Sequence, residues 1–310
     1  MTTGDAMAQE IFYWVFNMSI TAGLTGSIVL LLRLLPRLPK RFTVLLWSIP
    51  FFRMTVPLGL DSPYSLMSLL SRFATKTVVV YQPTPEVSFS MTNCITAADS
   101  YFPITYKVDL LAEVFQAASV VWLIGFGVIS VTLGVLYFTT LQEIKDARHL
   151  RDNLYLSDKI TTPGVYGIVR PKILLPSAYE NRDITFILLH EHAHIHRGDN
   201  FRRLLGFMIA TVHWFNPLAW VFLGRFLEDL ELSCDEWVLA KSPNLCPKDY
   251  ARSLLECRQS AGLFASSFGG AKIKTRIENI LSFRKLTWVS LTAFLVLLSA
   301  MFWVLLTNAG

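Results

Sequence analysis

The stretch Leu189-His190-Glu191-His192-Ala193-His194-Ile195-His196 decides how the rest of the chain is interpreted. It contains the pattern H-E-x-x-H. On a helix, at about 100° per residue, His190 and His194 lie one turn apart on one face, so their imidazoles can hold one Zn²⁺ ion. Glu191 is then placed to act on a water molecule at the metal. The pattern predicts the active-site helix of a zinc metalloprotease, provided that the surrounding chain supplies the remaining parts.

Composition indicates an integral membrane protein. Of the 310 residues, 53% are hydrophobic and 16% are charged, which is too apolar for an ordinary soluble domain. The net charge of +5 does not indicate nucleic-acid binding, because the basic residues cluster beside apolar runs, where lipid headgroups account for them. Four cysteines stand singly, which argues against a disulfide framework and against a cysteine-based zinc site. The lipid bilayer is therefore the first expected partner, and no direct contact with nucleic acid is expected.

Residues 1–138 are expected to form a membrane region. Apolar runs predict spanning helices over 11–32, 42–58 and 110–138. The first run is not a cleaved signal peptide, because acidic residues precede it and basic residues follow it. The second run contains two prolines and Arg53, and we expect it to be kinked.

Two features of this region are less regular. Residues 59–109 are polar and proline-rich, which predicts an extracellular loop, with a short interfacial helix near 65–73 and a small hairpin from 77–81 and 87–89. Arg53 lies inside a span, where an arginine pairs with another group or extends to the membrane surface. Glu113, entering the third span from the same side, is the candidate partner.

The basic clusters predict the orientation of the chain. They follow the first span, follow the third span and precede a fourth apolar run at 286–306. Because lysine and arginine favour the cytoplasmic side, both termini are expected outside, with 286–310 forming the last helix and a short outside tail. Residues 139–285 then form a cytoplasmic domain. Its final basic stretch, 272–285, is interpreted as a solvated segment beside the membrane.

Within that domain, β-branched residues and turn residues over 153–179 predict two or three short strands. An edge strand over 167–175 is expected to bind the extended substrate, as strand addition requires free backbone groups. Asp183 is the expected N-cap of the H-E-x-x-H helix, and Gly198 is expected to end it.

The apolar run 204–222 has two interpretations. It is apolar enough to cross the membrane, but crossing would separate the two halves of the site. Asn216 followed by Pro217 suggests a helix N-cap with proline in the first turn. We therefore prefer a hairpin of two helices, with His213 as a capping or packing residue of the bend.

The third metal ligand is expected downstream. Two histidines leave zinc short of a protein ligand, and a carboxylate from a separate helix completes one major class of such sites. Glu231 is the best candidate, with Glu228 as the alternative. Asp235 can orient a ligating imidazole by accepting its other N–H, and Asp199 competes for the same role.

These motifs resemble one known family. The matching segments are His190-Glu191-x-x-His194, 213–218, 231–239 and Lys274-x-Arg276-Ile277. Together they resemble the M56 peptidases, the bacterial membrane zinc proteases of the BlaR and MecR type of beta-lactam sensor-transducer. The resemblance covers nearly the whole chain. It implies Zn²⁺ bound by His190, His194 and Glu231, Glu191 as general base, and a cytoplasmic winged-helix repressor of the BlaI/MecI kind as substrate.

The overall prediction is a mainly α membrane protein of the bacterial cell membrane. Four transmembrane helices carry a cytoplasmic α+β zincin domain, gluzincin-like, between the third and fourth helices. Receptors of the family have a penicillin-binding domain after the last span, whereas this sequence ends at Gly310. A separate sensor protein or a second copy of the chain is therefore a candidate partner in antibiotic or cell-wall stress signalling. The alternatives are an M48-type quality-control or processing protease and a non-catalytic transducer.

Overall fold

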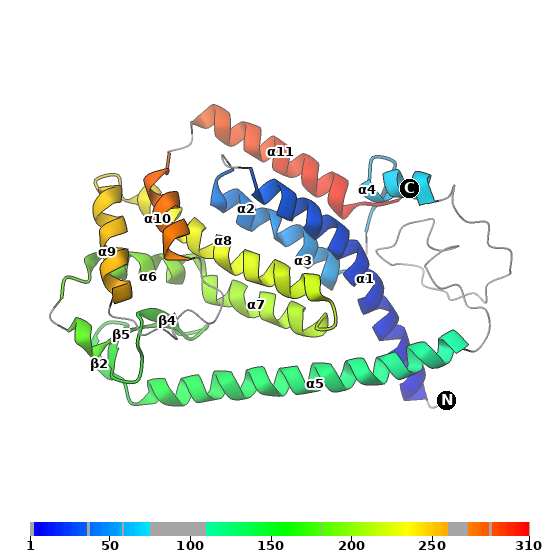
Figure 1. Ribbon diagram of the computed structural model, residues 1–310, viewed down its shortest axis with the longest axis horizontal. Coiled ribbons are helices and arrows are strands. Elements are labelled where there is room, and N and C mark those ends of the chain that lie inside the picture. Colours follow the sequence, from blue (N-terminus) through cyan, green and yellow to red (C-terminus); the bar gives the residue numbers. More distant parts are fainter. Residues whose placement is uncertain are drawn as a thin grey trace.

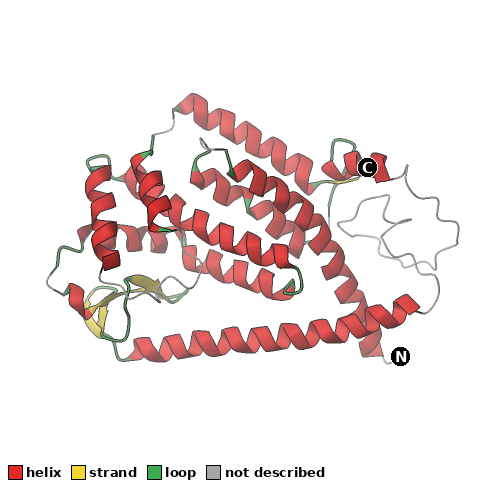
Figure 2. Cartoon of the chain, viewed as in Figure 1, coloured by secondary structure: helices red, strands yellow, loops and turns green. Residues whose placement is uncertain are grey.

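The computed structural model describes residues 3–35, 38–57, 59–74, 110–180, 182–259, 272–284 and 287–309. The expected hairpin of 77–81 and 87–89, and most of the expected loop 59–109, lie outside these residues. The described chain is mainly helical, with a small sheet at one end (Figures 1 and 2).

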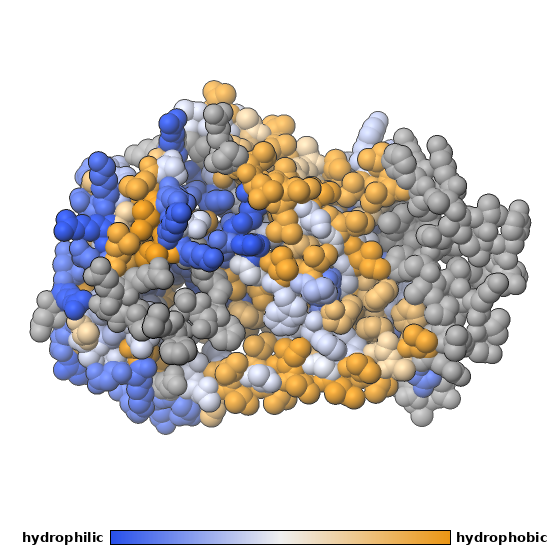
Figure 3. Space-filling view, viewed as in Figure 1, coloured by the Kyte–Doolittle hydropathy of each residue, from blue (hydrophilic) through white to orange (hydrophobic). Residues whose placement is uncertain are grey.

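Three helices are long and apolar enough to cross a membrane, over 7–33, 114–142 and 288–306. These segments agree with three of the predicted spans. The space-filling view shows apolar surface over them, whereas polar surface gathers at the end of the molecule that holds the sheet (Figure 3). The helices are α1 (Thr3–Arg33), α5 (Leu110–Lys145) and α11 (Trp288–Leu306).

The expected second span is divided into α2 (Lys40–Leu46) and α3 (Ser48–Thr55). Pro50 explains the division at Trp47, because it has no N–H for the carbonyl of Leu46 and its ring crowds that carbonyl. Together the two helices extend about 24 Å, less than the roughly 30 Å of a hydrocarbon core. A fourth span therefore stays a prediction.

Arg53 is fully buried and does not extend to the surface. Its guanidinium donates to the carbonyl oxygens of Leu305 and Thr307 and, at 2.8 Å, to Oδ1 of Asn308. These acceptors close the end of α11, whose last carbonyls have no partners within the helix. The side chain of Glu113 lies outside the described residues, so its predicted pairing with Arg53 stays a prediction.

Short helices and strands lie near the contact between α3 and the end of α11. The expected interfacial helix is present as α4 (Leu66–Ala74). Strand β1 (Asp61–Ser62) pairs in parallel with β6 (Asn308–Ala309), so the last described residues lie against the start of the loop.

The expected helical hairpin is confirmed. It consists of α7 (Asp199–Val212) and α8 (Pro217–Lys241). Oδ1 of Asn216 accepts the N–H of Leu218 at 2.9 Å, and Pro217 occupies the first turn. At the bend, His213 is 2.6 Å from Oγ of Ser19 in α1 and 2.8 Å from the carbonyl oxygen of Met54 in α3. The bend therefore lies among the apolar helices.

One hydrophobic core joins the hairpin to these helices. Trp47 of α2–α3 and Phe222 of α8 are both fully buried, with ring centres 5.7 Å apart. Residues of α1, α3, α7 and α11 complete the same cluster. The sequence predicted that the membrane region ends at residue 138. The hydrophobic core contains residues from both sides of that boundary.

The sheet corrects one prediction. Its order is β2-β3-β5-β4, with β3 and β5 parallel and the other pairs antiparallel. The expected edge strand at 167–175 is wrong, because β5 is paired on both sides. The edge beside α6 belongs to β4 instead. The strands are β2 (Arg148–Arg151), β3 (Leu154–Ser157), β4 (Gly164–Tyr166) and β5 (Lys172–Pro176).

Helix α6 (Thr185–Arg197) carries the H-E-x-x-H pattern. The N-cap is Ile184 and not the predicted Asp183, which lies one residue before it and accepts the N–H of Thr185 at 3.0 Å. Gly198 ends the helix as predicted, in a left-handed conformation with φ of 66°. One face of α6 packs on the sheet through apolar side chains, and the other faces α8 and α9. Helices α9 (Pro247–Gln259) and α10 (Ile273–Leu281) cover that second face.

Candidate metal site

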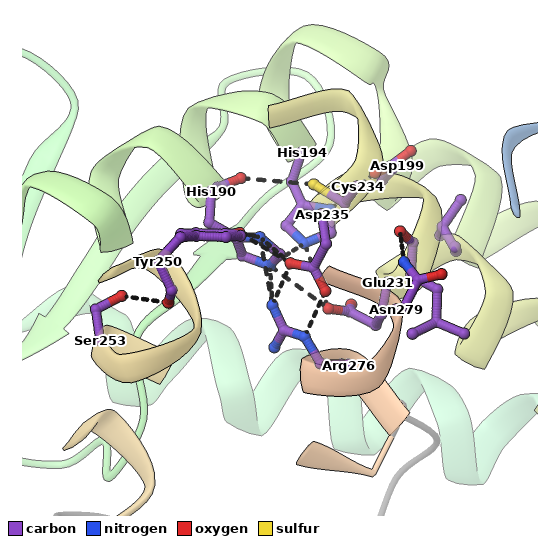
Figure 4. Close-up of polar contacts among 12 residues, drawn as sticks. His190, His194, Asp199, Glu231, Cys234, Asp235, Tyr250, Ser253, Arg276 and Asn279 are labelled. Carbon is purple, nitrogen blue, oxygen red and sulfur yellow. Dashed lines mark hydrogen bonds and ion pairs between the residues drawn. The ribbon is translucent and has the colours of Figure 1, made fainter. Parts of the chain in front are cut away.

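The two histidines of α6 face one another as their spacing predicts. Nε2 of His190 lies 3.1 Å from Nε2 of His194, and both residues are about 95% buried (Figure 4). The rings meet nearly at right angles, at 87°. Both Nε2 atoms can therefore approach one ion.

Glu231 reaches the same point from α8. Its Oε2 lies 3.6 Å from Nε2 of His190 and 3.6 Å from Nε2 of His194. Tetrahedral zinc with bonds of about 2.0–2.2 Å places its donor atoms roughly 3.3–3.6 Å apart. The two separations of 3.6 Å fit that requirement, and the 3.1 Å between the two nitrogens is slightly shorter. Glu228, the alternative ligand, pairs with Arg33 and Arg225 instead.

Cys234 is a fourth donor that the sequence did not predict. Its Sγ and donor atoms of His190 and His194 all lie within 4.8 Å of one another. The thiol is fully buried and also approaches the carbonyl oxygen of His190 at 3.7 Å. The sequence spacing could have predicted this position. Cys234 follows Glu231 by three residues, so both lie on the same face of the helix.

The outer nitrogens of the two rings have separate partners. Nδ1 of His194 lies 2.8 Å from Oδ2 of Asp199. Nδ1 of His190 lies 2.9 Å from Oη of Tyr250 and 3.2 Å from Oδ1 of Asp235. Such partners fix the tautomer and orientation of a ligating imidazole. Asp199 and Asp235, which the sequence placed in competition, thus contact different histidines.

Arg276 holds Asp235 with two hydrogen bonds of 2.8 Å. Burial raises the pKa of Asp235, but the guanidinium outweighs that effect and leaves the pKa well below its usual value. Tyr250 donates to the same carboxylate at 2.8 Å, and burial raises the pKa of its hydroxyl. The solvated state expected for 272–285 is therefore wrong for Arg276, although Lys274 is exposed. Arg276 belongs to one of the motifs that resemble the M56 family. The basic composition of the segment nevertheless led to the prediction that its side chain is solvated.

Arg203 of α7 was also missed. It forms an ion pair with Oε1 of Glu231, the oxygen that faces away from the histidine pair. Burial raises the pKa of Glu231, whereas the charges of His194 and Arg203 lower it, and the result lies well below the usual value. Glu231 is therefore ionised, as a metal ligand must be.

Glu191 is 7% exposed. Among the residues that the structure describes, its carboxylate takes part in no hydrogen bond or ion pair. A carboxylate that is not engaged by neighbouring side chains is free to exchange a proton with a substrate or a water.

This arrangement is typical of the H-E-x-x-H metallopeptidases. Two histidines come from one helix, a carboxylate comes from a second helix, and acidic groups hold the rings. The family described as BlaR1 peptidase M56 matches residues 13–280, so the chain belongs to that family. Membership in M56 sets the M48 alternative aside.

Three relatives share parts of the chain. The regulatory protein BlaR1 of Bacillus licheniformis is 31% identical over 159 residues, which cover 48% of this chain and 26% of the relative. The methicillin resistance mecR1 protein of Staphylococcus aureus (strain Mu50 / ATCC 700699) is 30% identical over 105 residues, 33% of this chain and 18% of the relative. The regulatory protein BlaR1 of Staphylococcus aureus is 26% identical over 135 residues, which cover 40% of this chain and 23% of the relative. The matched part thus spans about a quarter or less of each relative.

Proposed function

We propose that this chain is a membrane zinc endopeptidase that cleaves a cytoplasmic regulatory protein. One observation carries the proposal: donor atoms of His190, His194 and Glu231 lie 3.1–3.6 Å apart, close to the spacing around one zinc ion. Relatives named regulatory and resistance proteins support a role in transmembrane signalling. The substrate that this role favours is a DNA-binding repressor of the BlaI/MecI winged-helix kind.

Each residue of the site has a separate role in the proposed hydrolysis of the peptide bond. Zinc, when bound, would polarise the scissile carbonyl and make a water more acidic. Glu191 takes a proton from that water as the oxygen attacks the carbonyl carbon. The same carboxylate then gives the proton to the leaving amine as the C–N bond breaks. Asp199 and Tyr250, with Asp235, keep the histidine rings oriented throughout.

We place the extended substrate along the edge of β4 that pairs with no strand in the described part of the chain. Nδ2 of Asn200 donates to the carbonyl oxygens of Val165 and Gly167, at 3.0 and 2.9 Å, so the substrate would pair with the remaining backbone groups of this edge. Asn200 follows Asp199, so the strand edge and His194 are held by adjacent residues of α7. Backbone pairing along such an edge supplies affinity without demanding one particular side chain.

The proposal includes the orientation of the chain in the membrane. The basic clusters favour both termini outside, which puts the metal site on the cytoplasmic side. A protease there meets a cytoplasmic repressor without moving any part of itself across the bilayer.

Purified variants test the activity. Glu191→Ala is expected to keep fold and zinc while losing about 10²- to 10⁴-fold of the cleavage rate, because one positioned general base supplies that factor. His190→Ala should lose the metal. His192→Ala is the matched control, since its side chain is exposed on the same helix and cleavage should be unchanged.

The substrate can be identified by comparing protein fragments in cells that carry the unmodified protein or Glu191→Ala. Repressor fragments that appear with the unmodified protein should vanish with Glu191→Ala. A purified Glu191→Ala protein that still cleaves, free of other proteases, would eliminate the mechanism. Signalling that survives without cleavage would instead favour a non-catalytic transducer.

A further inference from the structure

Helix α7 contacts two of the three candidate metal ligands. Asp199 and Arg203 stand one turn apart on it, and they contact His194 of α6 and Glu231 of α8. The role of Asp199 follows the usual histidine–carboxylate pattern. The role of Arg203 does not, because it contacts the carboxylate ligand itself.

We propose that Arg203 is a positioning residue that restricts Glu231 to binding the metal through one oxygen. This inference rests on the proposed metal site. The pair leaves Oε1 with the guanidinium and Oε2 with the two Nε2 atoms, 3.6 Å from each. A carboxylate can bind a metal through one oxygen or through both. Engagement of Oε1 by Arg203 removes the second possibility.

The consequence concerns the number of ligands at the metal. Two histidines and one carboxylate oxygen leave a fourth tetrahedral position open, which a catalytic zinc site needs for water or substrate. A second oxygen from Glu231 would compete for that position. Arg203 therefore keeps the site catalytic by limiting how many donor atoms the protein supplies.

The contact is particular to Arg203 among the nearby arginines in the described part of the chain. Arg202 is adjacent but 45% exposed, and its Nη1 lies 3.6 Å from Oδ1 of Asp199. Arg197 lies 3.5 Å from the other oxygen of Asp199 and from the carbonyl oxygen of Leu230. Arg276 binds Asp235, and its Nη2 lies 3.2 Å from Nε2 of His190. Of these arginines, Arg203 alone forms an ion pair with Glu231.

Cobalt substitution tests the inference, because the visible absorption of Co²⁺ reports its coordination number independently of activity. The unmodified full-length protein, stripped of metal and loaded with Co²⁺, should show the strong absorption of four-coordinate cobalt. Arg203→Met should give several-fold weaker absorption, typical of five ligands. Arg203→Lys should restore part of the difference, since lysine retains the charge without the planar fork. Arg225→Met is the control and should leave the spectrum unchanged, because Arg225 is exposed and pairs with Glu228.

Activity provides a second measurement. Arg203→Met should lower kcat with little change in KM, because it alters the open position rather than the strand edge that binds the peptide. A metal-loaded Arg203→Met protein with the unmodified spectrum would overturn the inference and leave the proposed protease intact. Failure of the unmodified protein to bind metal would overturn the proposed function itself.

X-ray absorption of the unmodified zinc protein gives an answer that does not depend on the folding of any variant. The inference requires a single carboxylate oxygen near the metal, and ligation by two oxygens overturns it. A sulfur-to-cobalt charge-transfer band in the cobalt spectrum would identify Cys234 as a ligand. That result would also overturn the inference, because Glu231 would no longer decide the open position.

Discussion

At the site, each candidate ligand is held by a second residue from another helix. Asp199 contacts His194, Asp235 and Tyr250 contact His190, and Arg203 contacts Glu231. Ligands fixed in advance lose little conformational entropy when a metal binds, so the site is preorganised.

Metal binding should weaken as the pH falls. Burial lowers the pKa of His194, but the charge of Glu231 and the hydrogen bond to Asp199 outweigh burial and raise it. Zinc must displace the proton of this ring, so affinity drops about tenfold per pH unit below the raised pKa for each proton released. Chelator competition over roughly pH 6–8 measures the slope. Asp199→Asn should move the dependence to lower pH, and an affinity independent of pH would contradict the assignment.

Zinc affinity distinguishes the two candidate carboxylates. Glu231→Gln should lower it strongly, because Oε2 of Glu231 faces both histidines. Glu228→Gln should leave it unchanged, because Glu228 pairs with Arg33 and Arg225. Equilibrium dialysis of the two variants makes the comparison. Loss only with Glu228→Gln would reverse the assignment.

The sequence predicts the candidate ligands but not their cationic partners. His190, His194 and Glu231 follow from helical spacing and from the ligand count of zinc. Arg203 and Arg276 act across pairs of helices, and their partners Glu231 and Asp235 lie 28 and 41 residues away. No local periodicity marks such contacts. An arginine beside a membrane has the same sequence signature whether it is solvated or buried.

Helix α8 is bound on both sides of Glu231 by the end of α1, by the start of α2 and by Trp47, which follows α2. Asp229 accepts two bonds from Arg33 and one, at 2.9 Å, from Nε1 of Trp47. Further along, the carboxylate of Glu236 accepts the N–H groups of Lys40 and Arg41 at the start of α2. These N–H groups have no partners within their own helix. The position of Glu231, the third candidate ligand, thus depends on the first two apolar segments.

Asp229→Ala should destabilise this junction. Asp229 is fully buried, and its loss leaves Nε of Arg33 and Nε1 of Trp47 without their acceptor, while Arg33 keeps its contact with Glu228. Removing one partner of a buried ion pair typically costs about 3–5 kcal/mol. Thermal unfolding in detergent should show a clearly lower Tm. Glu228→Gln is the control, since Glu228 is more exposed and the expected change is smaller. Equal shifts in the two variants would show that the buried carboxylate has no special role.

For the whole molecule, hydropathy predicted the three long apolar helices correctly. It could not predict where the α7–α8 hairpin packs, because the apolar face of such a hairpin suits lipid and protein equally well. The contacts of His213 with Ser19 and Met54 are what place the bend among the helices. The edge strand was assigned wrongly because strand order depends on pairing that a linear pattern does not contain.

Thiol labelling tests the orientation. Cys246 is exposed, and the proposed topology puts it on the cytoplasmic side. In intact cells a membrane-impermeant reagent should therefore leave Cys246 unmodified until the membrane is opened, whereas Cys94 in the 59–109 segment should react from outside. Cys94 lies outside the described residues. Labelling of Cys246 in sealed cells would reverse the orientation.

The buried Arg53 also sets an order for biosynthesis. Its acceptors on Leu305 and Thr307 are separated from it by 252 and 254 residues. At about 5–20 residues per second, the ribosome needs roughly 13–50 s to make that intervening chain. Through this interval the guanidinium lacks both of those acceptors at the end of α11. The corner between α3 and α11 can therefore close only late in synthesis, long after the H-E-x-x-H helix has left the ribosome.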